Sequence, residues 1–235
     1  MKKIKINYYD LGAHCGEEAK LMHGYFEKMS IGRDIVYKIH AIEADKGFAG
    51  WLFSDTAQYN RRTWQVYNFA ISDRSGPVKL YHSEDYRSVK NKDGVLELTG
   101  GNGNSIFASK SNVTDKYNIV PGIPFSLFLE NESPDFRDCF NILKVNIEGA
   151  EWHLFNDLIK NDLVKYFHIF CGDGYDIEKI GELSDKVDEY YKMLKDNNIK
   201  IYRFTEHKPE QNELTPDLLW EKIQEYRKEN VYDFI

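Results

Sequence analysis

The sequence has few of the features that characterise secreted or membrane-spanning proteins. Its 235 residues include only three cysteines, and no two of them form a CxxC pair. This argues against a disulfide scaffold and against a zinc knuckle. There is no run of about 18 apolar residues, so no membrane span is predicted. The basic start Met1-Lys2-Lys3 is not followed by the apolar stretch of a signal peptide. We therefore expect a reduced, cytoplasmic location.

Positive charge is also scarce. The 31 Lys and Arg residues are outnumbered by 38 Asp and Glu residues, giving a formal net charge of −7, and they are scattered among the acidic residues. Because nucleic-acid binding relies on a basic face that neutralises phosphates, we do not expect a nucleic-acid partner. Aromatic residues are abundant at 14%. Their faces suit stacking on sugars or adenine, although most aromatic rings pack in cores. The sequence does not indicate an oligomeric state.

The chain is long enough for one large domain that needs neither disulfides nor metal to fold. Apolar runs typical of buried strands alternate with segments of helical periodicity. The expected strands cover residues 4–9, 34–43, 64–71, 140–147, 166–171 and 199–204, and the expected helices cover residues 17–29, 48–53, 125–129, 152–159, 177–194 and 215–226. This alternation predicts an α/β fold, a doubly wound and mostly parallel sheet with helices on both faces.

One region interrupts the alternation. Residues 72–81 read as a hairpin-like excursion, residues 84–103 are mostly polar, and residues 113–129 suggest an edge strand or extended segment, since they contain Pro121 and Pro124. A long polar stretch in a compact domain is usually a lid or a binding loop. We therefore expect a single domain over residues 1–235 with an inserted loop or lid region at about 82–130, and a disordered insertion is the alternative.

The first strand leads into a glycine turn and then a helix, over residues 8–19. Gly12 and Gly16 allow the backbone to come close to a ligand, and the start of the helix offers N–H groups to an anion. The turn does not match GxxxxGK[ST], which excludes a phosphate-cradling loop. It does not match GxGxxG either, which argues against a nicotinamide- or nucleotide-sugar-dependent enzyme. It suits a ligand with a zwitterionic amino-acid tail, whose ammonium group Asp10 or a turn carbonyl would accept.

In a parallel sheet, ligands bind beyond the carboxyl ends of the strands. This rule brings several predicted strand ends to one edge: residues 12–16, Glu43, Ser72 and Asp73, residues 146–148, and Asp173. A carboxylate at the end of the second strand, here Glu43, is the acceptor that the hydroxyls of a ribose need. A solvated carboxylate at the strand end is the alternative interpretation.

Four stretches in this order resemble the FkbM-like family of class I S-adenosylmethionine-dependent methyltransferases. They are Asp10-Leu11-Gly12-Ala13-His14-Cys15-Gly16, Ile42-Glu43-Ala44, Asn68-Phe69-Ala70-Ile71-Ser72-Asp73-Arg74-Ser75-Gly76, and Ile142-Leu143-Lys144-Val145-Asn146-Ile147-Glu148-Gly149-Ala150-Glu151. The resemblance implies a Rossmann-like, seven-stranded, mostly parallel sheet and S-adenosylmethionine as cofactor. The positions that it implies for cofactor binding are Asp10, Gly12, Ala13, His14, Gly16, Glu43, Ala44, Ala70, Ser72 and Asp73.

The sequence departs from the family pattern at three places. His14 stands where the family usually has Asn, Asn146 stands where it usually has Asp, and Asp173 follows the fifth strand in place of the more usual Glu. Asn146 removes a negative charge next to the expected reaction centre. A domain that binds the cofactor without turnover is therefore an alternative to an enzyme.

The resemblance implies O-methylation of a glycan or a secondary metabolite, and the aromatic content favours a hydroxyl of a sugar or glycan. We expect Glu148 to be the first candidate for the general base, Asp173 the second, and Asn146 to lie beside them. Glu151 either takes part or caps the helix that follows, and Lys144 either pairs with Glu148 or is a charge at the sheet end. Glu148 and Asp173 also carry the hard oxygen ligands that Mg²⁺ or Mn²⁺ accepts, so a metal site is a further hypothesis.

Overall fold

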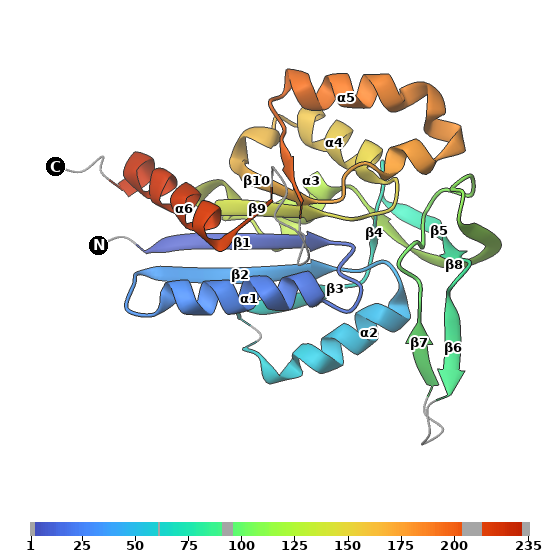
Figure 1. Cartoon of the computed structure of the whole chain (residues 1–235), viewed down its shortest axis with the longest axis horizontal. Helices are drawn as coiled ribbons and strands as arrows, with labels where there is room; N and C mark the ends of the chain where they lie inside the picture. The colour runs from blue at the N-terminus through green and yellow to red at the C-terminus, as the bar shows by residue number, and fades with distance from the viewer. Residues whose placement is uncertain (1–2, 61, 91–95, 204–212, 232–235) are drawn as a thin grey trace.

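A computed structural model describes residues 3–60, 62–90, 96–203 and 213–231. Its centre is a six-stranded sheet in the order β11-β10-β9-β1-β2-β3, with every neighbouring pair parallel (Figure 1). The strands are β1 (Ile4–Leu11), β2 (Ile35–Ile42), β3 (Trp64–Tyr67), β9 (Phe140–Val145), β10 (Phe167–Gly172) and β11 (Ile201–Tyr202). The expected α/β fold with a mostly parallel sheet is confirmed. Among the described residues the sheet has six strands, so the seventh strand is not confirmed.

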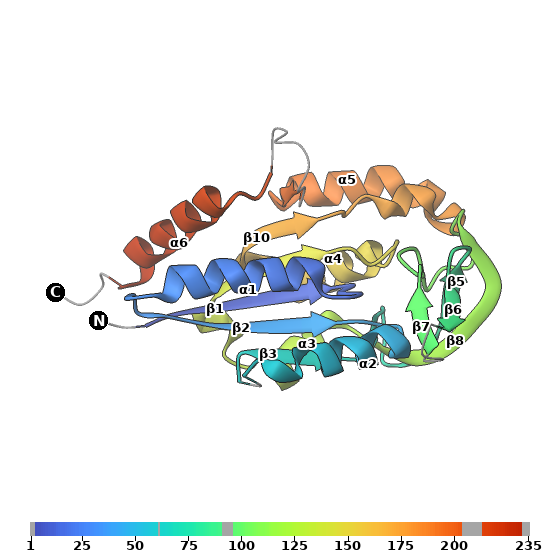
Figure 2. The ribbon, with the colours of Figure 1, turned by 60° about the horizontal axis from the view of Figure 1, so that its bottom comes forward.

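Both faces of the sheet are buried. Successive side chains of a strand point to opposite faces, and the successive residues Tyr8 and Tyr9 of β1 are both completely buried. The helices lie on both sides of the sheet (Figure 2). Tyr8 belongs to an apolar cluster that includes side chains of α1 and α6, whereas Tyr9 belongs to one that includes side chains of α3, α4 and α5. Helix α2 packs on β3 through Leu52. The helices are α1 (Glu17–Ser30), α2 (Lys46–Asp55), α3 (Phe125–Glu132), α4 (Glu151–Lys160), α5 (Val187–Asp196) and α6 (Pro216–Val231). Short 3₁₀ turns are η1 (Thr56–Gln58), η2 (Phe136–Asp138), η3 (Val164–Tyr166), η4 (Asp176–Lys179) and η5 (Gly181–Lys186). No helix in these described ranges combines the length and the apolar character needed to cross a membrane.

The strand expected over residues 64–71 is divided into two. β3 ends at Tyr67, and β4 (Ala70–Ile71) joins a different sheet. The Asn68 side chain explains the break, because its amide nitrogen donates to the carbonyl oxygens of Glu43 and Ala44, both at 2.9 Å. These bonds tie the chain to the end of β2 and turn it away from the ladder. The strand expected over 199–204 is shorter, and Phe204 lies outside the described residues.

The prediction of one long helix over residues 177–194 is wrong. The chain forms η4 and η5 first, and α5 begins only at Val187. Between the two turns Ile180 is extended, with φ −103° and ψ 106°. The backbone N–H of Ser111 donates to the carbonyl oxygen of Lys179, and the backbone N–H of Gly181 donates to that of Ser109. This segment therefore pairs with the part of the chain that precedes β8. The sequence has helical periodicity there, but these pairings hold the backbone out of a helix.

The inserted region forms a second, three-stranded sheet in the order β4-β8-β5 and a hairpin of β6 with β7. The strands are β5 (Gly76–Ser83), β6 (Arg87–Lys90), β7 (Leu96–Thr99) and β8 (Val113–Ile123). They lie beyond the carboxyl ends of the parallel strands (Figure 1). β8 is the middle strand of this sheet, whereas the sequence led us to expect an edge strand or an extended segment. Pro121 is tolerated because β4 pairs only with Gly122 and Ile123, which come after it.

Candidate functional site

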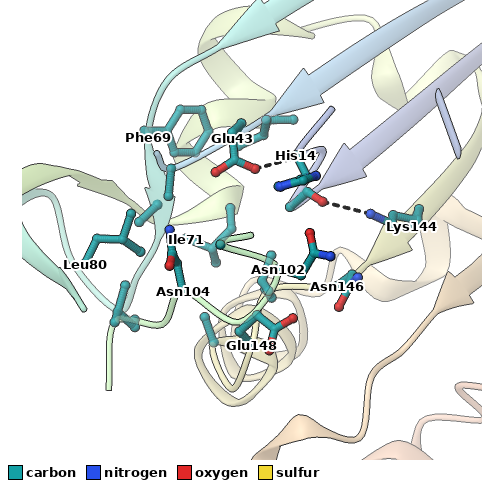
Figure 3. A pocket seen from close by; sticks show the side chains of 18 of the residues that line it. His14, Glu43, Phe69, Ile71, Leu80, Asn102, Asn104, Lys144, Asn146 and Glu148 are labelled. Carbon is teal, nitrogen blue, oxygen red and sulfur yellow. Dashed lines mark hydrogen bonds between the residues drawn. The ribbon is translucent and has the colours of Figure 1, made fainter. Parts of the chain in front are cut away.

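A cavity opens at the carboxyl edge of the central sheet, between the neighbouring strands β1 and β9 (Figure 3). From β1 the chain continues to β2 on one side, and from β9 it continues to β10 on the other side. This is the topological switch point at which doubly wound sheets bind ligands. Seven of the predicted residues line it: Gly12, His14, Glu43, Ala44, Ala70, Asn146 and Glu148. The inserted region adds Gly101, Asn102, Asn104 and Ile106, and the start of α1 adds Glu17 and Glu18.

Six predicted residues do not line the cavity. Asp10 is completely buried beneath it, and Ala13 and Gly16 belong to the turn that frames it. Ser72 is buried in the turn after β4, where its hydroxyl donates to the Arg74 carbonyl oxygen at 2.5 Å. Asp73 and Asp173 are exposed, the latter directly after β10. The strand-edge rule therefore placed these residues in the right region, but not all of them on the cavity wall.

Gly12 is required by the local geometry of the turn. Its φ is +75°, a region that L side chains rarely adopt, and a Cβ placed on it would lie 1.8 Å from the Asn146 carbonyl oxygen. The backbone N–H groups of Gly12 and Ala13 both donate to the Ile42 carbonyl oxygen at 3.0 Å. The turn thus joins the ends of β1, β2 and β9 tightly and leaves the cavity between them.

His14 connects this turn to the inserted region. Its φ of +45° lies in the left-handed region, where Asn, Asp and His are enriched among non-glycine residues. Its ring packs on Phe48 with the ring centroids 4.1 Å apart, and its Nε2 lies 3.1 Å from the Gly100 carbonyl oxygen. The sequence left the role of His14 open, and the structure gives it a bridging position at the cavity wall.

Glu43 is held rigidly at the end of β2. One carboxylate oxygen accepts the backbone N–H of His14 and the other accepts that of Asp45, each at 2.7 Å. Burial raises the pKa of Glu43, and the two backbone hydrogen bonds oppose this rise. The predicted acceptor is therefore buried and oriented, with free lone pairs on both oxygens for a ligand.

Lys144 pairs with Asp10, which neither of the two roles left open for it anticipated. Its Nζ lies 2.8 Å from the Asp10 carboxylate and donates to the Gly12 carbonyl oxygen at 2.9 Å. Both side chains are at most 2% exposed. The pair is a buried support beneath the glycine turn, since it ties β9 to the end of β1.

Glu148 has a pair of neighbours that sequence reasoning missed. The Lys110 ammonium, 1% exposed, donates to the Glu148 carboxylate at 2.5 Å and to the Gly103 carbonyl oxygen at 3.0 Å. Burial raises the pKa of Glu148 to about 7, and a hydrogen bond with Asp176 and its charge add to the rise, while Lys110 opposes it. Asp176 is itself 3% exposed and pairs with Lys179.

The backbone around Glu148 is constrained as well. Its φ is +58°, and its carbonyl oxygen accepts the Ser105 hydroxyl at 2.6 Å. Glu151 accepts the backbone N–H groups of Ile147 and Gly149 at 3.2 and 2.6 Å. Glu151 therefore holds the turn that leads into α4, but it does not cap the helix, because both donors come before the first helical residue.

The signals for the missed residues were weak. Lys110 lies in a polar loop without periodicity, and it is 38 positions from Glu148 in the chain. Asp176 comes three residues after Asp173 in the same polar stretch. A rule based on strand ends selects the first acidic residue after the strand, whereas the fold buries the second.

The side chains present do not fit the metal site expected at Glu148 and Asp173. The Glu148 carboxylate already has an ammonium partner, and Asp173 does not line the cavity. Within the described ranges, no three His, Cys, Asp or Glu side chains are grouped closely enough to hold a metal ion. We therefore derive no chemistry through a metal.

Comparison with known proteins gave one finding. The family model described as methyltransferase FkbM domain matches residues 10–204. A search of curated proteins and a search of solved structures each found no significant match. The matched range contains every element that lines the cavity.

Proposed function

The chain belongs to the FkbM methyltransferase domain family, and on this basis we propose that it transfers a methyl group from S-adenosylmethionine to a hydroxyl oxygen of a sugar or glycan. Family membership supports methyl transfer. The cofactor, the oxygen acceptor and the sugar are parts of the proposal, and the features of the cavity described below support them.

Three features of the cavity wall support S-adenosylmethionine as the ligand. Backbone N–H groups at the start of α1 suit the carboxylate of the amino-acid tail, and the oriented Glu43 carboxylate suits the ribose hydroxyls. Glu17 and Glu18 supply negative charge for a cationic ligand. When bound, the cofactor supplies an electrophilic methyl group on a sulfonium.

Glu148 is the observation that carries the proposed chemistry. A hydroxyl acceptor has to lose a proton as its oxygen is methylated, and a base is most effective when its pKa is near the working pH. Glu148 lines the cavity, and burial together with Asp176 raises its pKa to about 7 against the opposing charge of Lys110. A positioned base of this kind contributes about 10²–10⁴-fold to a rate. Asp173, the second candidate from the sequence, is exposed and does not line the cavity, so Glu148 is the better supported of the two.

The polar end of the cavity supports a hydroxylated acceptor. Asn102, Asn146 and Glu148 lie together on this side and offer amide and carboxylate groups (Figure 3). Hydroxyl groups pair with both kinds of partner. The same features suit a secondary metabolite with hydroxyl groups, which stays the alternative. A domain without turnover is less well supported, because Glu148 retains the carboxylate that Asn146 lacks.

A methyl-release assay tests the proposal. The protein and S-adenosylmethionine are incubated with a panel of monosaccharides, oligosaccharides and hydroxylated metabolites, with and without Mg²⁺. We expect transfer to at least one sugar, and the variant Glu148→Gln to bind the cofactor but lose about 10²-fold or more in kcat. No binding of S-adenosylmethionine by calorimetry would refute the cofactor assignment. Full turnover of Glu148→Gln would remove Glu148 as the base.

A further inference from the structure

Asn104 carries a buried hydrogen-bond donor without a partner. Its Oδ1 accepts the backbone N–H of Ser83 at 2.8 Å. Because that N–H is a donor, the oxygen must face it, and the orientation of the side-chain amide is therefore determined. The remaining Nδ2 is buried and has no hydrogen-bond partner among the described residues. Buried donors in folded proteins almost always have a partner, so this one needs an explanation.

The side chain lies at the apolar end of the cavity. Phe69, Ile71 and Leu80 line this end of the cavity together with Asn104, on the side away from Asn146 and Glu148 (Figure 3). Ala70 and Leu80 belong to an apolar cluster that Ala44 packs against. An apolar slot with an unpartnered amide donor in its wall suits a flat heteroaromatic ring that offers an unprotonated nitrogen.

We propose that Asn104 recognises the adenine ring of the cofactor, with Nδ2 donating to one of the ring nitrogens N1, N3 or N7. This inference rests on the proposed function, because it takes S-adenosylmethionine as the ligand. The slot lies next to Ala44, directly after the Glu43 carboxylate proposed for the ribose. A ring attached to that ribose therefore reaches it. The exocyclic amino group of adenine is a donor and does not match Nδ2, whereas the ring nitrogens are acceptors.

The assignment ties cofactor recognition to the inserted region. Asn104 lies between β7 and β8, and its anchor Ser83 is the last residue of β5. Neither belongs to the four stretches that resemble the family pattern. The inserted region would thus supply a specificity contact to the cofactor in addition to covering the carboxyl edge of the sheet.

Calorimetry with S-adenosylhomocysteine and its 1-deaza, 3-deaza and 7-deaza analogues tests this contact without a need for the acceptor. In each analogue one ring nitrogen is replaced by C–H. We expect one of the three to bind the unmodified protein about tenfold more weakly than S-adenosylhomocysteine, and the other two to bind equally well. Asn104→Ala and Asn104→Asp should both bind S-adenosylhomocysteine about tenfold more weakly, and they should no longer distinguish the sensitive analogue from the parent compound.

Two comparisons keep the test decisive. Asn104→Asp retains the oxygen that accepts the Ser83 N–H and removes the donor, so it separates the donor from the anchor. Asn118→Ala changes an exposed asparagine on β8 and should behave like the unmodified protein in every titration. Equal binding of all three analogues and S-adenosylhomocysteine would overturn the role of Asn104 while leaving the proposed function intact. Failure of the unmodified protein to bind S-adenosylhomocysteine at all would overturn both.

Discussion

Replacing Lys110 by Met removes the positive partner of Glu148, and the cost of this change depends on pH. Lys110 is buried and makes two contacts, to the Glu148 carboxylate at 2.5 Å and to the Gly103 carbonyl oxygen at 3.0 Å. The Glu148 side chain is 14% exposed. Met fills a similar volume, so the variant tests the charge more than the packing.

The magnitude follows from the two contacts. Loss of the hydrogen bond to Gly103 costs about 1 kcal/mol at any pH. The second loss leaves a carboxylate without its partner, which costs about 3–5 kcal/mol when the charge is forced to remain. Removal of Lys110 raises the pKa of Glu148 above its value of about 7, so at pH 6 the carboxyl group avoids this cost by holding a proton. We therefore expect a loss of about 1 kcal/mol at pH 6 and about 4 kcal/mol at pH 9.

Linkage gives the sign of the pH dependence. The pKa of Glu148 in the folded protein, about 7, lies above the ordinary value of 4.5, so its contribution to stability falls as pH rises between these two values. Without Lys110 the folded pKa rises further and the fall continues above pH 7. Each unit of that rise adds about 1.4 kcal/mol to the loss at high pH.

Urea denaturation of both proteins at pH 6, 7.5 and 9 measures these values. Lys110→Arg keeps the charge and should recover most of the loss. Lys116→Met removes an exposed lysine on β8 and should change stability by less than about 0.5 kcal/mol at every pH. A loss for Lys110→Met that is the same at pH 6 and pH 9 would refute the reasoning, because the variant would then be acting through packing alone.

Three further predictions follow from the site. Asp176→Asn should move the acidic limb of the pH profile of kcat/KM to lower pH, because the hydrogen bond and charge of Asp176 raise the pKa of Glu148; an unchanged limb would contradict this. Gly12→Ala places its Cβ 1.8 Å from the Asn146 carbonyl oxygen and should lower the free energy of unfolding, measured by urea denaturation, by about 3 kcal/mol or more. The control Gly24→Ala, on an open part of α1, should raise the free energy of unfolding by about 0.5–1 kcal/mol. EDTA should leave cofactor affinity and methyl transfer unchanged, because the Glu148 carboxylate already has a lysine partner; activity that EDTA removes and Mg²⁺ restores would show the opposite.

The parts of the site that sequence reasoning predicted lie at the ends of parallel strands. Gly12, Glu43, Asn146 and Glu148 line one cavity because parallel strands bring their carboxyl ends to the same edge. That rule needs only strand periodicity and chain order, both of which are visible in the sequence. It does not say which way a side chain points after the strand has ended, so it selected Asp173 where the fold buries Asp176.

Errors in the elements have the same origin. The run over residues 177–194 has helical period, yet hydrogen bonds with residues 109–111 keep its first part out of a helix. The run over 64–71 is continuous in composition, yet the Asn68 amide bonds to the end of β2 and divides it. In both cases contacts with distant residues override a local preference.

The alternating architecture, the glycine turn and the family membership can be recognised in the amino-acid sequence alone, because they depend on periodicity and on residues close together in the chain. The partners of the functional groups depend on the tertiary structure. Lys110 reaches Glu148 and Asn104 reaches the apolar end of the cavity because the inserted region folds over the carboxyl edge of the sheet. A polar loop residue has no periodic signal, and its role depends on which buried group it meets.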